Sequence, residues 1–183
     1  MKKVAIILAD GFEELEAISV IDILKRASIS VEILAIGNVR VTGAHDITIE
    51  ADEIFNYYNA LDLDAIVFAG GMANAKALSE EGTVIDLVNH YYKNEKIVAA
   101  ICASPAFILP KTKIPKSTSV TCYPDEGLVP MLDGFKFVDD NVVVSNNVIT
   151  SQSPFTALEF ALSIVDYLGG DARQLLADLE GRG

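Results

Sequence analysis

Cys102 is the residue of this sequence that could act as a nucleophile. An apolar run rich in β-branched residues, 97–101, stops at this cysteine, and Ala103, Ser104 and Pro105 follow it. This order is typical of a strand that enters a sharp turn and opens a helix, the geometry that exposes nucleophiles in other proteins. The N–H groups and the dipole at a helix N-terminus favour a thiolate. Alternatively, Cys102 is a small buried hydrophobic residue, and the local sequence does not separate the two interpretations.

Glu16 is the carboxyl group that could exchange a proton with this thiol. In a helix it would share a face with Phe12 and Val20, and a carboxyl group on an apolar face has a raised pKa. Such a group can act as acid and base in turn. Glu13 and Glu14 precede it in the same first turns, where acids commonly do no more than complement the helix dipole.

Gly70 and Gly71 follow another short apolar run. Without Cβ atoms, their backbone N–H groups could approach a substrate oxygen closely, as an oxyanion hole requires. The simpler interpretation is a tight turn. Neither of the glycine-rich phosphate-binding motifs occurs in the chain, which disfavours a nucleotide cofactor.

The chain has only two histidines, His45 and His90, and both are expected at the surface. Neither is adjacent to Cys102 in sequence, so a thiol protease of the Cys–His type has little support. Histidine, cysteine and acidic residues do not occur at zinc-ligand spacing either. We therefore predict no metal site and no cofactor.

The elements that must position these residues alternate between buried strands and helices. Strands are predicted over 4–9, 31–36, 65–69 and 96–101, a hairpin over 40–50, and helices over 12–27, 73–78, 84–94 and 154–168. Asp10 is expected to cap the first helix. The alternation predicts an α/β fold with a mostly parallel, doubly wound sheet. In such sheets ligands bind beyond the carboxyl ends of the strands, and segments 10–16, 70–74 and 102–105 all follow strands, so one shared site is predicted.

Length and charge limit the class of protein. The 183 residues are consistent with a single domain over 1–183. A net charge of −12 argues against nucleic acid and anionic membranes as partners. The first apolar run is too short to span a membrane and lacks a signal-peptide cleavage site. Two cysteines without a signal peptide predict a reduced, cytoplasmic protein.

Several ordered motifs together resemble the ThiJ/PfpI superfamily, in particular the branch of the parkinsonism-associated protein deglycase. The motifs lie at 11–16, 70–74, 99–105, 120–124, 150–154 and 159–162. The resemblance runs from about residue 4 to about residue 168 and implies a flavodoxin-like three-layer sandwich that forms a homodimer.

The resemblance also implies roles for individual residues. Cys102 matches the nucleophile, and Glu16 matches the carboxyl group that hydrogen-bonds the thiol. Gly70 and Gly71 match glycines whose amides face the substrate oxygen. Arg26 matches an arginine near the dimer interface.

The chain departs from the family pattern in several places. Tyr123 falls where a histidine is frequent, and a phenol is a poor base at neutral pH. Ala103 stands where the protease-like branch has a histidine, which makes peptidase activity unexpected. Ser104 replaces a common glycine, and Gln152 replaces an arginine of some relatives. Tyr123, Ser104 and Asn74 are expected to line the pocket.

Two functions from different classes fit these residues. The first is a cofactor-independent glyoxalase, or related deglycase, acting on small 2-oxoaldehydes such as methylglyoxal. In it Cys102 attacks the aldehyde, Glu16 transfers a proton between carbons, and the amides of Gly70, Gly71 and Ala103 stabilise the oxyanion. The second is a redox-responsive protective or chaperone-like protein with little turnover. There Cys102 is oxidised to a sulfinate that accepts a hydrogen bond from protonated Glu16.

Overall fold

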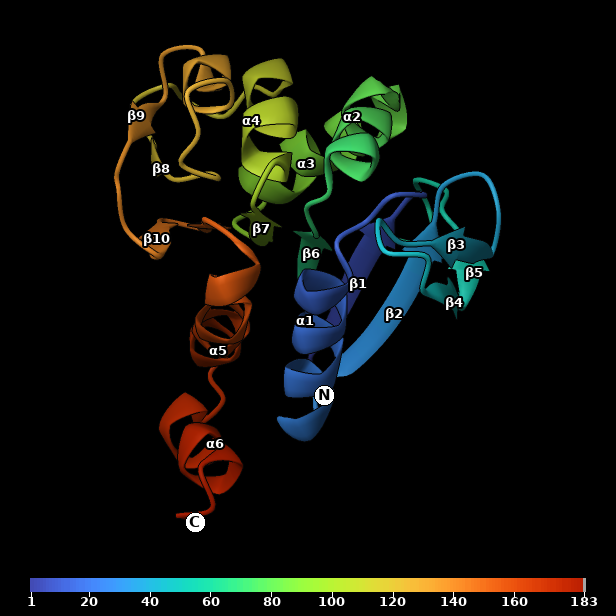
Figure 1. Cartoon of the computed structure of the whole chain (residues 1–183), viewed down its shortest axis with the longest axis vertical. Coiled ribbons are helices and arrows are strands. Elements are labelled where there is room, and N and C mark those ends of the chain that lie inside the picture. Colours follow the sequence, from blue (N-terminus) through green and yellow to red (C-terminus); the bar gives the residue numbers. More distant parts are fainter. Residues whose placement is uncertain (183) are drawn as a thin grey trace.

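The centre of the fold is a sheet of seven strands in the order β10-β11-β7-β6-β1-β2-β5 (Figure 1). The structure, a computed structural model, describes residues 1–182. Neighbouring strands of this sheet are parallel except for the antiparallel pair β10–β11. The strands are β1 Lys3–Leu8, β2 Ser30–Ala35, β5 Glu53–Ile54, β6 Ala65–Phe68, β7 Ile97–Ile101, β10 Val142–Ser145 and β11 Val148–Ser151. The α/β class and the mostly parallel sheet are thus confirmed.

Helices cover both faces of the sheet. The pair α1 (Glu14–Arg26) and α5 (Ala157–Tyr167) lies side by side on one face (Figure 1). The other face is covered by α2 (Met72–Glu80), α3 (Gly82–Lys93) and α4 (Ser104–Ile108). Helix α6 (Ala172–Leu179) follows α5, and no helix within residues 1–182 is both long and apolar enough to cross a membrane.

Alternating side chains of β1 explain why two layers of helices form. Ile6 and Leu8 pack with the α1 and α5 side, whereas Ala5 and Ile7 pack with the opposite side. Successive residues of a strand point to opposite faces, so a strand buried on both faces must be apolar throughout. Full burial of each large aliphatic side chain contributes roughly 1.5–3 kcal/mol.

The chain reverses its direction of winding at β1. From β1 it passes to β2 on one side, and it later returns to β6 on the other side. The carboxyl ends of β1, β6 and β7 therefore meet at one edge of the sheet, next to the point where ligands bind in doubly wound folds. The segments after these three strands carry the predicted site.

Smaller elements complete the fold. Strands β3 (Arg40–Thr42) and β4 (Thr48–Glu50) form the predicted hairpin, and β8 (Ser119–Val120) pairs with β9 (Lys136–Phe137). Short 3₁₀ turns cover Leu109–Lys111, Val129–Leu132 and Pro154–Thr156. The predicted helix over 154–168 thus begins with one of these turns, and its α-helical part starts at Ala157.

The expected cap of the first helix is wrong. Glu13, not Asp10, has the extended backbone of a cap, and its carboxylate accepts the Glu16 N–H at 2.9 Å. Asp10 instead accepts the N–H of Thr42 at 2.9 Å. Asp10 therefore ties the loop after β1 to the β3–β4 hairpin, a long-range contact that helix-start patterns do not indicate.

Candidate active site

Cys102 lies in a strained turn between β7 and α4. Its φ is +64°, a left-handed conformation that residues with a side chain rarely adopt. The turn is held on both sides, because the Cys102 N–H donates to Ser151 O at 2.9 Å and the Cys102 carbonyl accepts from Tyr123 N at 2.8 Å. These two hydrogen bonds hold Cys102 in its strained backbone conformation, and such strain is common at functional sites. The predicted strand–turn–helix elbow is present, and its thiol is partly exposed.

The Glu16 carboxyl is fully buried beside this thiol. Its Oε2 accepts the Gly70 N–H at 2.6 Å, and the Cys102 thiol is a hydrogen-bonding neighbour of the same carboxyl. Within residues 1–182, the other oxygen, Oε1, is buried and accepts no N–H or O–H group. An unpartnered buried carboxyl oxygen carries a desolvation cost, and it leaves Glu16 with an atom free to take and return a proton.

Burial raises the pKa of Glu16 to about 7, outweighing the hydrogen bonds from Cys102 and Gly70 that lower it. The raised pKa expected from the apolar face is therefore confirmed. Burial also raises the pKa of the Cys102 thiol far above its ordinary value, and the Glu16 charge raises it further. The two groups behave as a pair that readily holds one negative charge and resists a second.

The expectation that the helix N-terminus lowers the thiol pKa is wrong in its net direction. Helix α4 has only five residues, and the backbone N–H groups of Ala103 and Gly71 that face the sulfur do not outweigh burial and the Glu16 charge. The sequence therefore predicts a helix effect on the Cys102 pKa that burial and the Glu16 charge outweigh.

Gly70 and Gly71 allow the loops that follow β1, β6 and β7 to approach one another closely at the Cys102 thiol. A Cβ on Gly70 would overlap the Glu16 carboxylate and Cys102. Gly71 has a φ of +86°, and a Cβ there would overlap the Gly11 carbonyl and the Glu13 N–H. The Gly70 N–H is already bonded to Glu16, so among the three predicted amides only those of Gly71 and Ala103 remain for a substrate oxygen.

Asn74 and Ser104 support the site from behind and do not line its cavity. Both are fully buried. Asn74 accepts the Ala9 N–H at 2.7 Å and donates to the carbonyls of Ala69 at 2.8 Å and Gly70 at 3.1 Å. Ser104 Oγ donates to the Ala69 carbonyl at 2.6 Å. Their predicted place in the pocket is wrong, because these bonds use the side chains to tie together the ends of β1, β6 and β7.

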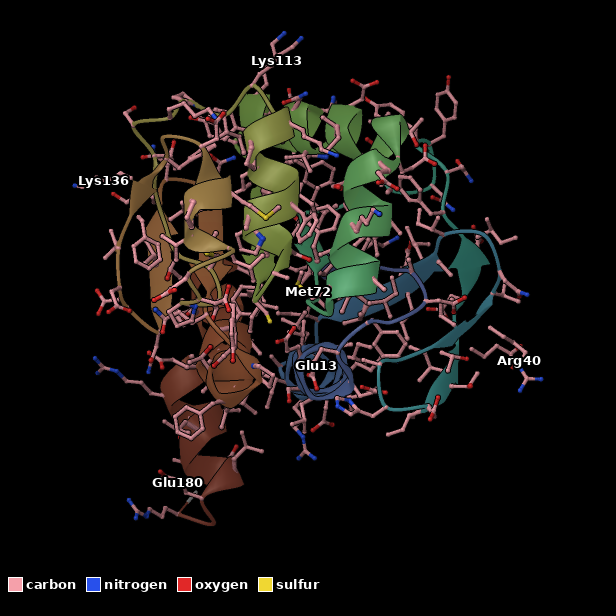
Figure 2. The ribbon with its side chains drawn as sticks, turned by 45° about the horizontal axis from the view of Figure 1, so that its top comes forward. Glu13, Arg40, Met72, Lys113, Lys136 and Glu180 are labelled. Atoms are coloured by element: carbon pink, nitrogen blue, oxygen red, sulfur yellow. The ribbon has the colours of Figure 1, made fainter. Side chains whose placement is uncertain are left out.

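A cavity of about 390 Å³ opens over the thiol. Its lining consists of Glu13, Gly71, Met72, Cys102, Ala103, Tyr123, Asp125 and Leu128. Figure 2 labels two of these residues, Glu13 before the start of α1 and Met72 at the start of α2. Tyr123 lines the cavity as predicted. The sequence did not indicate the other lining side chains, although Asp125 lies only two residues after Tyr123; they are Glu13, Met72, Asp125 and Leu128.

Other predicted residues lie outside the cavity. Gln152 donates to Asp139 at 2.8 Å. Arg26, in the last turn of α1, is half-exposed and pairs with Asp22 at 2.7 Å. His90 lies on α3 and lines a different surface hollow.

His45 forms a cluster that sequence spacing did not indicate. Its Nδ1 lies 2.7 Å from Glu14 and 3.9 Å from Glu13, and the three side chains could share a metal ion. Hydrogen bonding to Glu14 raises the pKa of the exposed His45. Burial works to raise the pKa of Glu14, but the hydrogen bonds from His45 lower it overall. The pair links the β3–β4 hairpin to the start of α1.

The fold and this site define a flavodoxin-like protein. Its thiol–carboxyl pair lies near the topological switch point of the sheet, where the chain changes its direction of winding at β1. The chain belongs to the DJ-1/PfpI family, whose match covers residues 2–167. It is 33% identical over 171 residues to the glutathione-independent glyoxalase DJR-1.2 of Caenorhabditis elegans, covering 92% of this chain and 90% of that protein.

Two further comparisons agree. The chain is 33% identical over 169 residues to DJ-1 homolog B of Arabidopsis thaliana, where the match covers 92% of this chain but 38% of the plant protein. The solved structure of oxidized Toxoplasma gondii DJ-1 superposes with a TM-score of 0.91 at 28% identity and covers 98% of both chains.

Proposed function

We propose that the protein is a cofactor-independent enzyme that converts small 2-oxoaldehydes to 2-hydroxy acids, a glyoxalase or deglycase type of activity. The observation that carries the proposal is the buried Glu16 carboxyl beside the Cys102 thiol, under a cavity of about 390 Å³. A glutathione-independent glyoxalase among the relatives supports the same reaction class.

The reaction begins with proton transfer from the Cys102 thiol to Glu16. The sulfur attacks the aldehyde carbon, and the carbonyl oxygen takes the proton to give a hemithioacetal. Glu16 then removes the proton on that carbon. The resulting enediolate places its negative charge within reach of the Gly71 and Ala103 N–H groups, which can stabilise it.

Glu16 completes the reaction by returning the proton to the neighbouring carbon, which leaves a thioester on Cys102. Water hydrolyses this thioester, the C–S bond breaks, and the thiol and a 2-hydroxy acid are formed. One water molecule is consumed in total, and no oxidant or reductant is needed. A carboxyl with a pKa of about 7 suits both proton transfers, because general acid–base catalysis is most efficient near the working pH.

The experiment that tests this proposal measures lactate formed from methylglyoxal without glutathione. We expect turnover in the wild type and its loss, by at least 10²-fold, in Cys102→Ala and Glu16→Gln. Cys122→Ala is the matched control, since this second cysteine is fully buried and does not line the cavity.

Absence of turnover above background in the wild type contradicts the enzyme proposal. The redox-responsive alternative then makes its own prediction. Peroxide would oxidise Cys102 to the sulfinate, as detected by mass spectrometry, and Glu16→Gln would shift the peroxide concentration required.

We also propose that the protein is a cytoplasmic homodimer. Large apolar side chains are exposed on the adjoining segments α1 and 154–158, including Leu15 at 63% and Phe155 at 91%. Their contact with a second copy would remove this apolar surface from water.

A further inference from the structure

The cavity over Cys102 has carboxylates at its rim. Glu13 and Asp125 both line it, from the start of α1 and from the loop after β8. A third carboxyl, Glu16, lies beneath the thiol. The cavity over Cys102 is therefore lined by two carboxylates from different segments, and the buried Glu16 carboxyl lies beside its thiol.

Balancing positive charge is scarce at this rim. Within residues 1–182, no lysine or arginine lines the cavity. The nearest cationic group to Glu13 is His45, whose Nδ1 lies 3.9 Å from Glu13 but only 2.7 Å from Glu14, its own partner. The side chain of His45 is 70% exposed, so its charge is also screened by water.

Asp125 is the carboxylate whose charge is free to act on a ligand. Its Oδ1 accepts the N–H groups of Gly127 at 2.7 Å and Leu128 at 3.1 Å, which fixes the side chain without neutralising it. Within the described residues it forms no salt bridge. Glu13 is also constrained, because it caps α1 through the Glu16 N–H.

We infer that this acidic rim makes the Cys102 site select uncharged and cationic carbonyl compounds and exclude those that carry a carboxylate or phosphate, with Asp125 as the main specificity-determining residue. A cleft lined by charge of one sign concentrates ions of the opposite sign and repels those of the same sign. The part of this inference that concerns substrates rests on the proposed function.

The same charges also act on the product. In the proposed reaction a neutral 2-oxoaldehyde becomes a 2-hydroxy acid anion. The acidic side chains therefore do not repel the substrate, but they do repel the product. Charge at the rim thus favours release of the product that the site itself generates.

The first test uses thiol reagents and does not depend on turnover. Cationic and anionic methanethiosulfonates of similar size each form a disulfide with Cys102 and release methanesulfinate, and mass spectrometry of the Cys102 peptide gives both rates. The ratio of the two rates cancels the fraction of thiolate, which is common to both reagents. A small free thiol in the same buffer supplies the reference ratio.

We expect the cation-to-anion ratio of the wild type to exceed the reference at least tenfold. In Asp125→Asn, which keeps the oxygen that Gly127 and Leu128 require, the ratio is expected to fall roughly threefold to tenfold. Salt at 1 M is expected to reduce it as well. Glu180→Gln is the matched control, because it removes one negative charge at the far end of the molecule from Glu13 and Met72 (Figure 2).

The second test compares 4,5-dioxopentanoate, an anionic 2-oxoaldehyde, with its neutral methyl ester. We expect kcat/KM to favour the ester in the wild type and the preference to shrink in Asp125→Asn. A wild-type reagent ratio near the reference, or an Asp125→Asn ratio equal to that of Glu180→Gln, overturns the inference. Absence of turnover on both aldehydes, with the reagent ratios as expected, contradicts the proposed function and leaves the selectivity in place.

Discussion

The proposed chemical role of Glu16 comes at a cost in stability. Its carboxyl is fully buried on the apolar face of α1, and burial raises its pKa from 4.5 to about 7. Between these pH values the folded protein keeps a proton on Glu16 that the unfolded chain has lost. The stability that depends on this group is therefore complete below about pH 4.5 and is lost as the pH rises through 7.

Replacing Glu16 with Gln is expected to stabilise the protein at pH 8 while abolishing turnover. The difference between 4.5 and about 7 corresponds to roughly 3 kcal/mol, and we expect a gain of about 1–3 kcal/mol in the free energy of unfolding. Urea unfolding at pH 4 and pH 8 measures it. The difference between variant and wild type should nearly vanish at pH 4, and an equal effect at both pH values would contradict the assigned protonation state.

The pH dependence of turnover follows from the same pair. Glu16 must be ionised before it can take the thiol proton, so kcat/KM for methylglyoxal is expected to rise about tenfold per pH unit below 7 and to level off above it. The second proton of the pair leaves only at much higher pH, because burial and the Glu16 charge hold the pKa of Cys102 far above its usual range. A profile that is flat from pH 5 to 8 would rule out Glu16 as the base.

At the scale of elements, the site is built by the three loops that follow β1, β6 and β7. At Gly70 and Gly71 these loops come so close together that a Cβ atom would overlap its neighbours. The Glu13 N–H donates to the Gly70 carbonyl at 3.1 Å, which joins the start of α1 to the loop after β6. Asn74 then joins that loop to the end of β1. The site therefore depends on backbone geometry as much as on its reactive side chains.

Gly71→Ala is expected to separate these loops. Both Gly71 and Gly134 have positive φ, +86° and +85°, but a Cβ on Gly71 would overlap the Gly11 carbonyl, whereas a Cβ on Gly134 would have no neighbour within 4 Å. We expect Gly134→Ala to cost about 1 kcal/mol from backbone strain, and Gly71→Ala to cost at least 1–2 kcal/mol more and to lower kcat/KM by 10²-fold or more. Thermal unfolding and turnover of both variants measure the difference, and equal losses would mean that the close approach is unimportant.

The fold was predictable because its strands are buried on both faces and its helices alternate with them. The strand–turn–helix elbow at Cys102 and the helix face that carries Glu16 each depend on residues that are close together in the sequence. Both features could therefore be predicted as well. The place of Asp125 in the cavity lining could not be predicted, because Asp125 lies in a loop whose position relative to the thiol is fixed only by the fold. Asn74 and Ser104 lie next to site residues in sequence, yet only the structure shows their side chains turned toward backbone carbonyls. The two-residue strand β5 is too short to leave a periodic pattern.

At the scale of the whole molecule, several exposed apolar side chains lie on two helices that contact each other. Helices α1 and α5 pack against each other, and each carries a large hydrophobic residue on its outer surface near its start, Ile18 at 44% exposed and Leu158 at 41%. The adjoining Leu15 and Phe155 are more exposed still. Exposed hydrophobic side chains gathered on neighbouring elements indicate an association surface.

We expect a homodimer at micromolar concentration, measured by light scattering or sedimentation. Leu15→Lys and Phe155→Lys together should shift the mass toward the monomer, because each buried apolar side chain of this size contributes roughly 1.5–3 kcal/mol and each lysine would carry an unpaired charge into the interface. Tyr58→Lys is the matched control, since Tyr58 is 82% exposed and lines a different hollow, together with Tyr57 and His90, to which neither α1 nor α5 contributes. A wild-type protein that stays monomeric well above micromolar concentration would contradict the dimer.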